Sequence, residues 1–436
     1  MTTRLTTEEL LWFNERYATV EVEGDYCVIR LEDGSVYSTT TFKESLAHMT
    51  RQYETEDWRL APDWLADPRR RRYPLGFEFD PTSPPSFEFI PDDDRRKYNL
   101  YRGFAVNPVE GNISPFLDFT HDIVCNGDQK LFEYVMAWLA NIVQCPGDKP
   151  GTALVLRGDQ GIGKGFFASC LGAVLGDHYV EVNDPVYLVG RFNHHLRDKL
   201  VVYADEGSFS GKMASNKLKN IITSERVLIE QKFRTPYTVE NYMRVIISGN
   251  HERLITASHD ERRYCVLEVR PDRKNDPAYW KKMFHWRDNG GAAALLHYLQ
   301  NHHIEINLRL VPTTEALWDQ KHQSLDDFDK WYFDCLQAGQ LGPGRRWEEW
   351  HPAEELRDSF LNHCGKTYNR SSATQFGTLL KKRVPGATKP RQSLGGRQPY
   401  GYRLPPLYEC RRAFEERFSV TLDWPQEPPN LKAVEG

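Results

Sequence analysis

A glycine-rich loop between a hydrophobic segment and an apolar helix start is the strongest chemical signal in the sequence. Residues 154–156 are apolar, and they are followed by a run of glycines and one lysine. Glycines let successive backbone N–H groups turn toward one anion, and the following helix directs its positive end at the same point. A lysine at this spacing adds a charge near the β- and γ-phosphates of a nucleotide. The predicted phosphate-binding loop, with ATP as ligand, comprises Gly158, Asp159, Gln160, Gly161, Ile162, Gly163, Lys164, Gly165 and Phe166.

The position after the lysine departs from the usual pattern. Ser or Thr normally stands there and binds Mg²⁺ through its hydroxyl, whereas this chain has Gly165. Magnesium then has to be held by a downstream acid, the nucleotide and water. We expect nucleotide binding to tolerate this change better than rapid hydrolysis does.

Two further hydrophobic segments end in polar residues. Residues 199–204 lead into Asp205 and Glu206, and residues 243–248 lead through a glycine to Asn250. Because the ends of parallel strands face the ligand crevice, we expect Asp205 to bind Mg²⁺ and Glu206 to orient the attacking water. Asn250 is expected to contact the γ-phosphate and that water, with a simple β-turn as the alternative.

Two arginines follow the third of these segments, within residues 260–264. Arg262 and Arg263 suit a finger that stabilises transition-state charge on the ATP of a neighbouring subunit. Such a finger implies a closed ring, because a head-to-tail interface places each finger in the next subunit's site. The alternative interpretation is a solvated charge cluster.

Length and composition set the broad class. With 436 residues, 40% hydrophobic and 12% aromatic, the chain has room for about two to four globular domains. A net charge of −5 means that any DNA-binding surface must be local. The eight cysteines show neither paired nor zinc-finger spacing, which favours free thiols. With no signal peptide or membrane span in the sequence, we expect a cytoplasmic protein.

The elements that must position these residues follow from the hydrophobic pattern. We predict an α/β protein with a parallel sheet, because residues 152–270 alternate strand and helix. The expected plan is an α+β accessory module plus linker at 1–100, a helical collar at 101–149, the nucleotide core at 150–270, a helical extension and linker at 271–345, and a basic module at 346–436.

Within the first module we expect a helix at 7–17, strands at 18–22, 26–31 and 35–40, and a linker or surface loop over 62–100. Asp92, Asp93 and Asp94 in that loop read as a solvated turn rather than a polymerase-type metal site. One apolar stripe predicts a helix at 118–143.

The motifs between residues 150 and 270 together resemble superfamily 3 helicases, most closely the primase–helicase proteins of phages, satellites and large DNA viruses. The resemblance implies an AAA+ core, Mg²⁺-dependent ATP hydrolysis, and a hexameric ring that moves on single-stranded DNA during replication of a phage or mobile element. It also implies a lysine-bearing hairpin that grips DNA, for which Lys232 is the first candidate and Lys217 and Lys219 are weaker ones. No primase domain is recognisable, so a separate primase or replication initiator is an expected partner.

The C-terminal module is locally basic. Helices are expected at 354–364 and 372–382, followed by a β-wing at 384–402, and this order resembles a winged helix. Basic residues far outnumber acids between Lys366 and Arg412, which favours DNA binding through Lys381, Lys382 and Arg383. A solubilising face or a protein-docking site is the alternative.

The sequence therefore predicts an ATP-dependent DNA helicase, with two rivals. One is a DNA-binding initiator or structural ring that uses ATP only as a switch, which Gly165 favours. The other is a defence-type NTPase, for which no effector motif is present. Glu206 and the arginine pair favour the motor.

Overall fold

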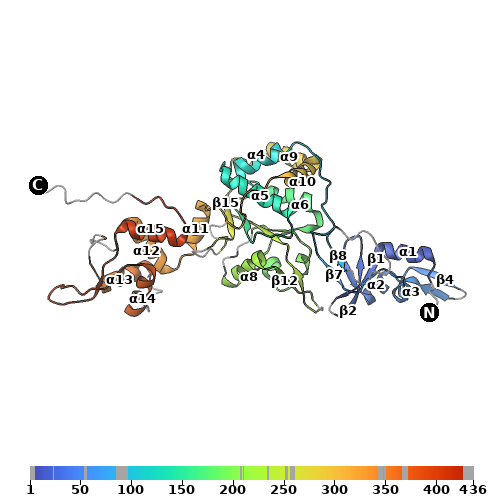
Figure 1. Cartoon of the computed structure of the whole chain (residues 1–436), viewed down its shortest axis with the longest axis horizontal. Helices are drawn as coiled ribbons and strands as arrows, with labels where there is room; N and C mark the ends of the chain where they lie inside the picture. The colour runs from blue at the N-terminus through green and yellow to red at the C-terminus, as the bar shows by residue number, and fades with distance from the viewer. Residues whose placement is uncertain are drawn as a thin grey trace. The chain divides into compact units, whose positions relative to one another are not determined.

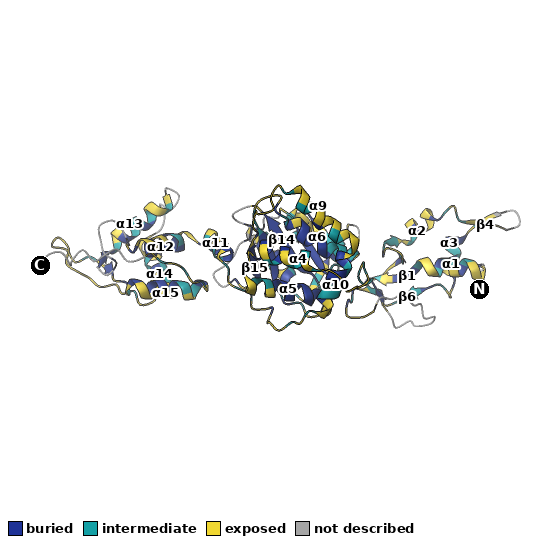
Figure 2. Ribbon diagram, turned by 90° about the horizontal axis from the view of Figure 1, so that it is seen from above, coloured by how far each residue is buried: buried dark blue, intermediate teal, exposed yellow. Residues whose placement is uncertain are grey.

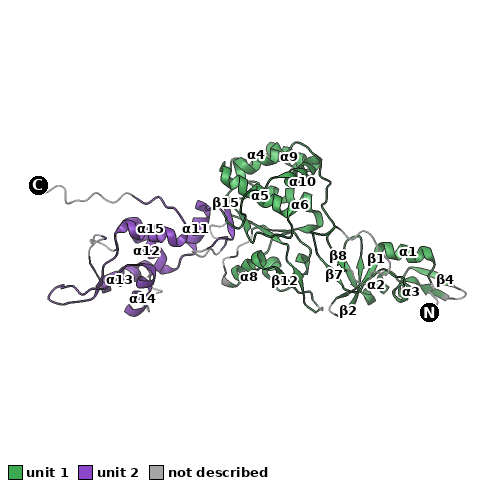
Figure 3. Ribbon diagram, in the orientation of Figure 1, with its two compact units in different colours: residues 1–250, 267–311 green, residues 251–266, 312–436 purple. Residues whose placement is uncertain are grey.

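The computed structural model describes residues 5–22, 24–53, 56–84, 97–206, 209, 211–232, 235–250, 254–255, 261–341, 347, 350–365 and 372–425. The chain, drawn with its elements labelled in Figure 1, divides into two compact units (Figure 3). Unit 1 contains residues 1–250 and 267–311, and unit 2 contains residues 251–266 and 312–436.

The centre of unit 1 is a sheet with the strand order β10-β11-β14-β9, and β15, which the boundary between the two units divides, is its fifth strand. Neighbouring pairs from β10 to β9 are parallel. Every residue of β11 and β14 is buried, as expected for strands that helices cover on both faces. The strands are β9 (Ala153–Arg157), β10 (Tyr179–Val182), β11 (Val201–Ala204), β14 (Arg244–Gly249) and β15 (Tyr264–Glu268).

Helices pack around this sheet, and Figure 2 shows their inner faces buried. Helix α10 (Ala292–Asn301) packs against both α5 (Gln129–Gln144) and α6 (Lys164–Leu175). Residues 134–142 of α5 are all buried, so this stretch is buried on every side rather than along the one stripe that the sequence predicts. The segment predicted as a helical collar is thus part of the same compact unit as the sheet.

Unit 1 also contains further helices and strands outside the N-terminal module. They are α4 (Ser114–Asp118), η1 (Phe119–Val124), η2 (Gly176–His178), α7 (Pro185–Val189), η3 (His194–Leu196), α8 (Lys212–Thr223), β12 (Arg226–Ile229), β13 (Tyr237–Glu240), α9 (Pro277–Trp286) and η4 (Arg287–Gly291).

The N-terminal module follows the predicted α+β order. Helix α1 begins with a capping box in which Thr6 and Glu9 bond each other's backbone N–H groups. The predicted strand at 35–40 is shorter, because the Ser38 side chain accepts from the Thr41 N–H and starts α2 there. The elements are α1 (Thr7–Arg16), β1 (Tyr17–Val22), β2 (Asp25–Arg30), β3 (Val36–Ser38), α2 (Thr39–Ser45), β4 (Thr50–Tyr53), β5 (Glu56–Arg59), α3 (Leu60–Ala66), β6 (Arg72–Tyr73), β7 (Phe77–Glu78) and β8 (Tyr98–Asn99).

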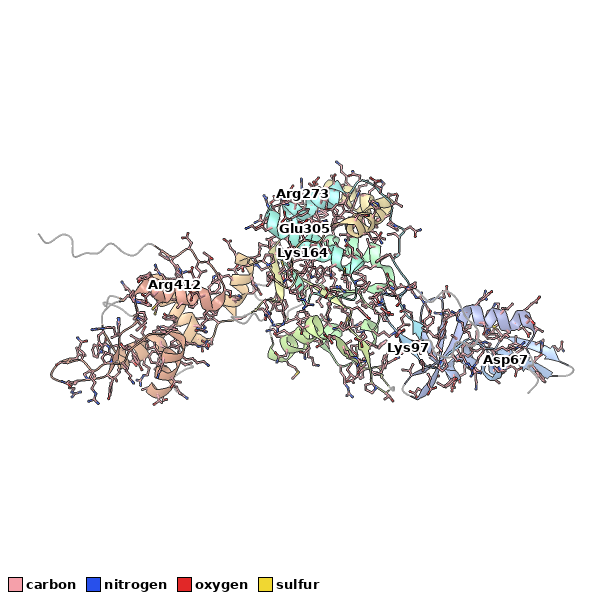
Figure 4. The ribbon with its side chains drawn as sticks, viewed as in Figure 1. Asp67, Lys97, Lys164, Arg273, Glu305 and Arg412 are labelled. Carbon is pink, nitrogen blue, oxygen red and sulfur yellow. The ribbon has the colours of Figure 1, made fainter. Side chains whose placement is uncertain are left out.

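The expectation of a linker over residues 62–100 was wrong for its described part. Asp67, labelled in Figure 4, is buried and lies 2.9 Å from Arg69. Strand β6 joins the sheet beside β1, and the buried rings of Tyr73 and Tyr98 lie 5.3 Å apart. A composition rich in Pro, Asp and Arg suggests an exposed loop, but internal pairing of its charges lets it pack. Residues 92–94 lie outside the described part of the chain.

Unit 2 is mainly helical. Its buried cluster contains Phe328, Trp331, Phe360, Phe376 and Phe414. Within the predicted helical extension, residues 318–336 belong to two helices, because Asp326 caps the second one through the Asp329 N–H. The elements are α11 (Glu315–Gln323), α12 (Asp327–Ala338), β16 (His351–Pro352), α13 (Ala353–Cys364), α14 (Ala373–Arg383), β17 (Gly401–Tyr402) and α15 (Leu407–Phe418).

An antiparallel ribbon follows α14, with bridges Thr388↔Arg403, Arg391↔Tyr400 and Leu394↔Arg397. The order of two helices and a ribbon matches the expectation for this module. The predicted segment 271–345 is divided, since α9 and α10 belong to unit 1 while α11 and α12 belong to unit 2.

The eight cysteines all lie within the described residues, and none of them forms a disulfide. Among the described helices, none combines the length and the apolar character that crossing a membrane requires.

Candidate nucleotide-binding site

The loop between β9 and α6 has the conformation that its glycines predict. Gly158, Gly161 and Gly163 have φ of +144°, +80° and +104°, a region that residues with a side chain rarely adopt. A Cβ on Gly163 would lie 2.2 Å from the ring of Trp280. Gly163 is also the N-cap of α6 and has no side chain to cap it. The first N–H groups of this helix are therefore available to an anion.

Lys164 holds the two ends of the loop together. Its Nζ donates to the carbonyl oxygens of Gly158 at 2.6 Å and Asp159 at 2.5 Å. Only 8% of the residue is exposed, and burial lowers the pKa of its ammonium group while the Asp205 carboxylate opposes that shift. A phosphate bound at the loop would accept from the Lys164 ammonium group in place of these two carbonyl oxygens.

One pocket of about 310 Å³ gathers the loop and the ends of β11 and β14. Because β14 lies between β9 and β11, its end brings Asn250 between the loop and the two acids. Gly158 and Asp159 instead bind Lys164, and Ile162 is buried. The predicted residues that line the pocket are Gln160, Gly161, Gly163, Lys164, Gly165, Phe166, Asp205, Glu206 and Asn250.

The two acids at the end of β11 are held differently. The Oδ1 atom of Asp205 accepts hydrogen bonds from the hydroxyls of Tyr203, at 2.8 Å, and Ser248. Glu206 is exposed and has φ of +52°, a strained conformation for a residue with a side chain. The strain marks a sharp turn directly after the strand, which leaves the Glu206 carboxylate at the pocket.

Two aromatic residues of α9 form a wall of the pocket that the sequence interpretation missed. Trp280 and Phe284 both line it. Phe166 joins them, with its ring centroid 5.7 Å from Trp280 and 5.1 Å from Phe284. Phe284 is 41% exposed, which leaves an aromatic face accessible to a flat ligand group. These residues lie far from the loop in sequence, so no local motif indicates them.

The oxygen donors fit Mg²⁺ bound together with a nucleotide. Within the described residues, no group of three or more His, Cys, Asp or Glu side chains could hold a metal ion. Mg²⁺ is usually held by one or two carboxylates together with phosphate oxygens and water. Asp205 and Glu206 are carboxylates of this kind at the pocket, whereas Gly165 supplies no hydroxyl.

The two predicted finger arginines belong to unit 2 and do not line the pocket of unit 1. Arg262 is exposed. Arg263 lies 3.0 Å from Glu261, whose side chain is fully buried. An arginine that acts on a neighbouring subunit is not expected in the pocket of its own chain.

The hairpin expected between the acid strand and the sensor strand exists. Strands β12 and β13 pair antiparallel from Arg226↔Glu240 to Ile229↔Tyr237. Lys232 lies in the segment that joins them, is exposed, and has its Nζ 5.6 Å from the ring centroid of Phe192. Lys217 and Lys219 lie on α8, where the Nζ of Lys217 donates to the Val189 carbonyl at 2.9 Å.

In unit 2, a groove of about 900 Å³ runs between α14 and the following ribbon. Lys381, Lys382 and Lys389 line it, and Lys381 and Lys382 are exposed. Arg383 is held differently, because it lies 2.8 Å from Asp326 and 3.3 Å from Asp329. Residues 366–371 lie outside the described part of the chain.

Comparisons with known proteins place this geometry in context. A family model described as "Family of unknown function (DUF5906)" matches residues 156–263. The DNA primase-polymerase of Nitratiruptor phage NrS-1 is 24% identical over 275 residues, which are 59% of this chain and 38% of that protein. The chain thus spans well under half of this relative's length.

Solved apo structures of the NrS-1 C-terminal region share the fold. One has a TM-score of 0.67 at 18% identity and covers 91% of this chain and 98% of that chain. A second has a TM-score of 0.67 at 17% identity, with the same coverage. The chain therefore has the mixed α/β fold of that region, including its parallel sheet.

Proposed function

We propose that this chain is an ATP-dependent DNA helicase of the superfamily 3 type, with an AAA+ core, that acts in the replication of a phage or mobile element. The observation that carries the proposal is the single pocket in which the loop, Lys164, Asp205, Glu206 and Asn250 meet. A glycine-rich turn or an isolated β-turn alone would not bring these groups together.

ATP binding follows from the chemistry of the pocket. The backbone N–H groups of the loop and of the start of α6 receive the phosphates, and Lys164 supplies the charge. The aromatic wall of Phe166, Trp280 and Phe284 offers a stacking surface for the adenine base.

Each polar group of the pocket has one role in the proposed hydrolysis of ATP. Asp205 would hold Mg²⁺, which would supply positive charge against the phosphate oxygens when bound. Glu206 orients the attacking water, and Asn250 contacts that water and the γ-phosphate. Arg262 or Arg263 of a neighbouring subunit stabilises the transition state, which requires a ring, proposed here as a hexamer.

DNA contacts are assigned to two surfaces. The β12–β13 hairpin presents Lys232 to single-stranded DNA in the pore, with Lys219 as a secondary contact. The groove of unit 2, interpreted as a winged-helix surface, presents Lys381 and Lys382 to DNA phosphates. The likeness to a phage DNA primase-polymerase supports a replication role, with a separate primase or initiator as partner.

A second candidate is a DNA-binding initiator or structural ring that uses ATP as an assembly switch. Gly165 favours it, because the loop lacks the hydroxyl that usually helps to hold Mg²⁺. Both candidates require ATP binding, so turnover decides between them.

Strand separation tests the proposal. The purified chain is mixed with a forked DNA duplex bearing a fluorophore and a quencher, and ATP is compared with a non-hydrolysable analogue. ATP should separate the strands and the analogue should not, while Lys164→Ala should be inactive with both. Separation with neither nucleotide, or equally with both, would contradict the motor.

A further inference from the structure

The hydroxyl of a buried tyrosine points to the place where the loop lacks its own. A Cβ on Gly165 would have the Tyr203 Oη atom as its nearest neighbour, at 3.8 Å. This is ordinary van der Waals contact, and the backbone of Gly165 is not in the left-handed region. A Ser at position 165 would thus bring its hydroxyl to the same neighbourhood as that of Tyr203.

Tyr203 is connected to the acid of the pocket and to the neighbouring strand. Its Oη lies 2.8 Å from Asp205 Oδ1 and 2.8 Å from Ser248 Oγ, and Ser248 Oγ also donates to Asp205 Oδ1. Only two hydroxyl protons are available for these three contacts, because an ionised carboxylate has no proton to donate. With both hydroxyls donating to Oδ1, that oxygen is fixed and Oδ2 is left as the oxygen for a cation.

Burial makes this arrangement rigid. Tyr203 and Ser248 are both fully buried, so water does not compete for their hydroxyls. The two hydroxyls come from adjacent parallel strands, β11 and β14.

We propose that Tyr203 is a positioning residue that orients the Asp205 carboxylate for Mg²⁺, and that it compensates for the absent hydroxyl at Gly165. This inference rests on the proposed ATP site. Ser248 shares the task. It lies on β14, two residues before Asn250. Strand β14 therefore holds the metal-binding acid through Ser248 and also positions the proposed γ-phosphate sensor.

Nucleotide binding, rather than turnover, gives the test. The full chain is titrated with a fluorescent ATP analogue at a series of Mg²⁺ concentrations and in EDTA. Tyr203→Phe keeps the ring and removes the hydroxyl. It should raise the Mg²⁺ concentration for half-maximal binding about tenfold, since a hydrogen bond to a charged group is lost. Affinity in EDTA should change by less than about twofold, since no phosphate contact is removed.

Rescue separates positioning from simple packing. Tyr203→Phe combined with Gly165→Ser should bring the Mg²⁺ requirement back to within about twofold of the native value, because the new hydroxyl replaces the missing one. In the native background, Gly165→Ser alone should lower the requirement. If Tyr203→Phe does not fold, Ser248→Ala and Gly165→Ser carry the same test, with a raised and a lowered requirement expected respectively.

The outcomes distinguish this inference from the proposed function. If the native chain binds no nucleotide with or without Mg²⁺, the ATP site itself is wrong. If the native chain binds nucleotide with Mg²⁺ but Tyr203→Phe, Ser248→Ala and Gly165→Ser all show the native Mg²⁺ requirement, the positioning role alone is overturned.

Discussion

The ammonium group of Lys164 lies 2.6 Å from the carbonyl oxygen of Gly158, at the opposite end of the same loop. The loop thus holds its cation with its own backbone, beside a pocket that contains both acids. An ATP phosphate would bind the Lys164 ammonium group in place of the loop carbonyls. Nucleotide binding and the conformation of the loop are therefore coupled through the Lys164 side chain.

Lys164→Ala should lower ATP affinity by at least about thirtyfold, because a desolvated charge pair with the phosphates is lost. Isothermal titration calorimetry with ATP and Mg²⁺ measures it. Lys130→Ala is the matched control, since Lys130 is exposed and lies outside the pocket. Native affinity in Lys164→Ala would contradict the site assignment.

Phe284→Ala should weaken ATP binding by about tenfold while leaving binding of inorganic triphosphate unchanged, because only the base loses its stacking partner. Phe284 is the cleaner probe of the aromatic wall, since Trp280 also packs against Gly163. Tyr187→Ala, at an exposed aromatic outside the pocket, is the control. Equal losses for ATP and triphosphate would mean that Phe284 shapes the loop instead.

Arg262→Ala should keep ATP affinity but reduce hydrolysis by about a thousandfold, the scale of a lost arginine finger. Mixed with Lys164→Ala protein, it should regain part of the activity, because some sites then combine an intact loop with an intact finger. Steady-state hydrolysis is measured over a series of mixing ratios. Absence of recovery at every ratio would argue against action between subunits. Arg263→Ala is less clean, because Arg263 also partners the buried Glu261.

Lys381→Gln with Lys382→Gln should weaken DNA binding and reduce the slope of log affinity against log salt by about two, one for each phosphate contact. Fluorescence anisotropy with a labelled duplex over a range of salt concentrations measures this slope. Arg412→Gln is the matched control, a 72% exposed cation on α15 that pairs with Glu416 at 3.5 Å. An unaltered slope in the lysine variant would place the DNA surface elsewhere.

Arg383→Gln should instead lower the stability of unit 2, because it breaks pairs with Asp326 and Asp329.

His178 should make the stability of unit 1 depend on acid pH. Its Nε2 accepts from the Arg102 N–H at 3.0 Å, and its Nδ1 lies 2.9 Å from the Asp198 carbonyl. Burial lowers its pKa, so the folded state favours the neutral ring. Below about pH 6.5, the ordinary pKa of a histidine, the unfolded state binds more protons than the folded state does. Stability is therefore complete above that value and is lost as the pH falls toward the folded pKa.

Thermal unfolding between pH 7.5 and 5 measures this effect. His178→Phe keeps the stacking on Tyr101 but loses both hydrogen bonds, so it should be less stable at pH 7.5 and less sensitive to acid. His303→Asn, at a histidine with an 84% exposed side chain, should keep the native pH profile. An equally steep acid loss in His178→Phe would assign the effect to another group.

Local chemistry decided which parts of the structure could be predicted. The loop of Gly158, Gly161 and Gly163 needs positive φ and close packing. Glycine alone permits both readily, so the glycines in the sequence predict the loop. The start of α1 was predicted at residue 7, and the structure has Thr6 and Glu9 in a capping box at that point. The strand ends at Asp205 and Asn250 followed from hydrophobic runs that stop at polar residues.

Features that depend on distant partners could not be predicted. Trp280 and Phe284 reach the pocket from a helix that follows the last strand of the sheet, and no spacing rule links them to the loop. The Tyr203 and Ser248 hydroxyls meet Asp205 only because β11 and β14 are neighbours. Residues 62–100 suggested a linker or surface loop by composition, although Asp67 and Tyr73 are buried, and the ring of Tyr73 packs on the distant Tyr98.

The most direct test of the central claim is ATP hydrolysis by the purified full chain, measured with and without single-stranded DNA, together with its mass in solution. We expect hydrolysis that DNA stimulates, from a particle with the mass of a hexamer, and no hydrolysis in Lys164→Ala. Tight ATP binding with negligible turnover in the presence of DNA would contradict the motor and favour the ATP-switched initiator.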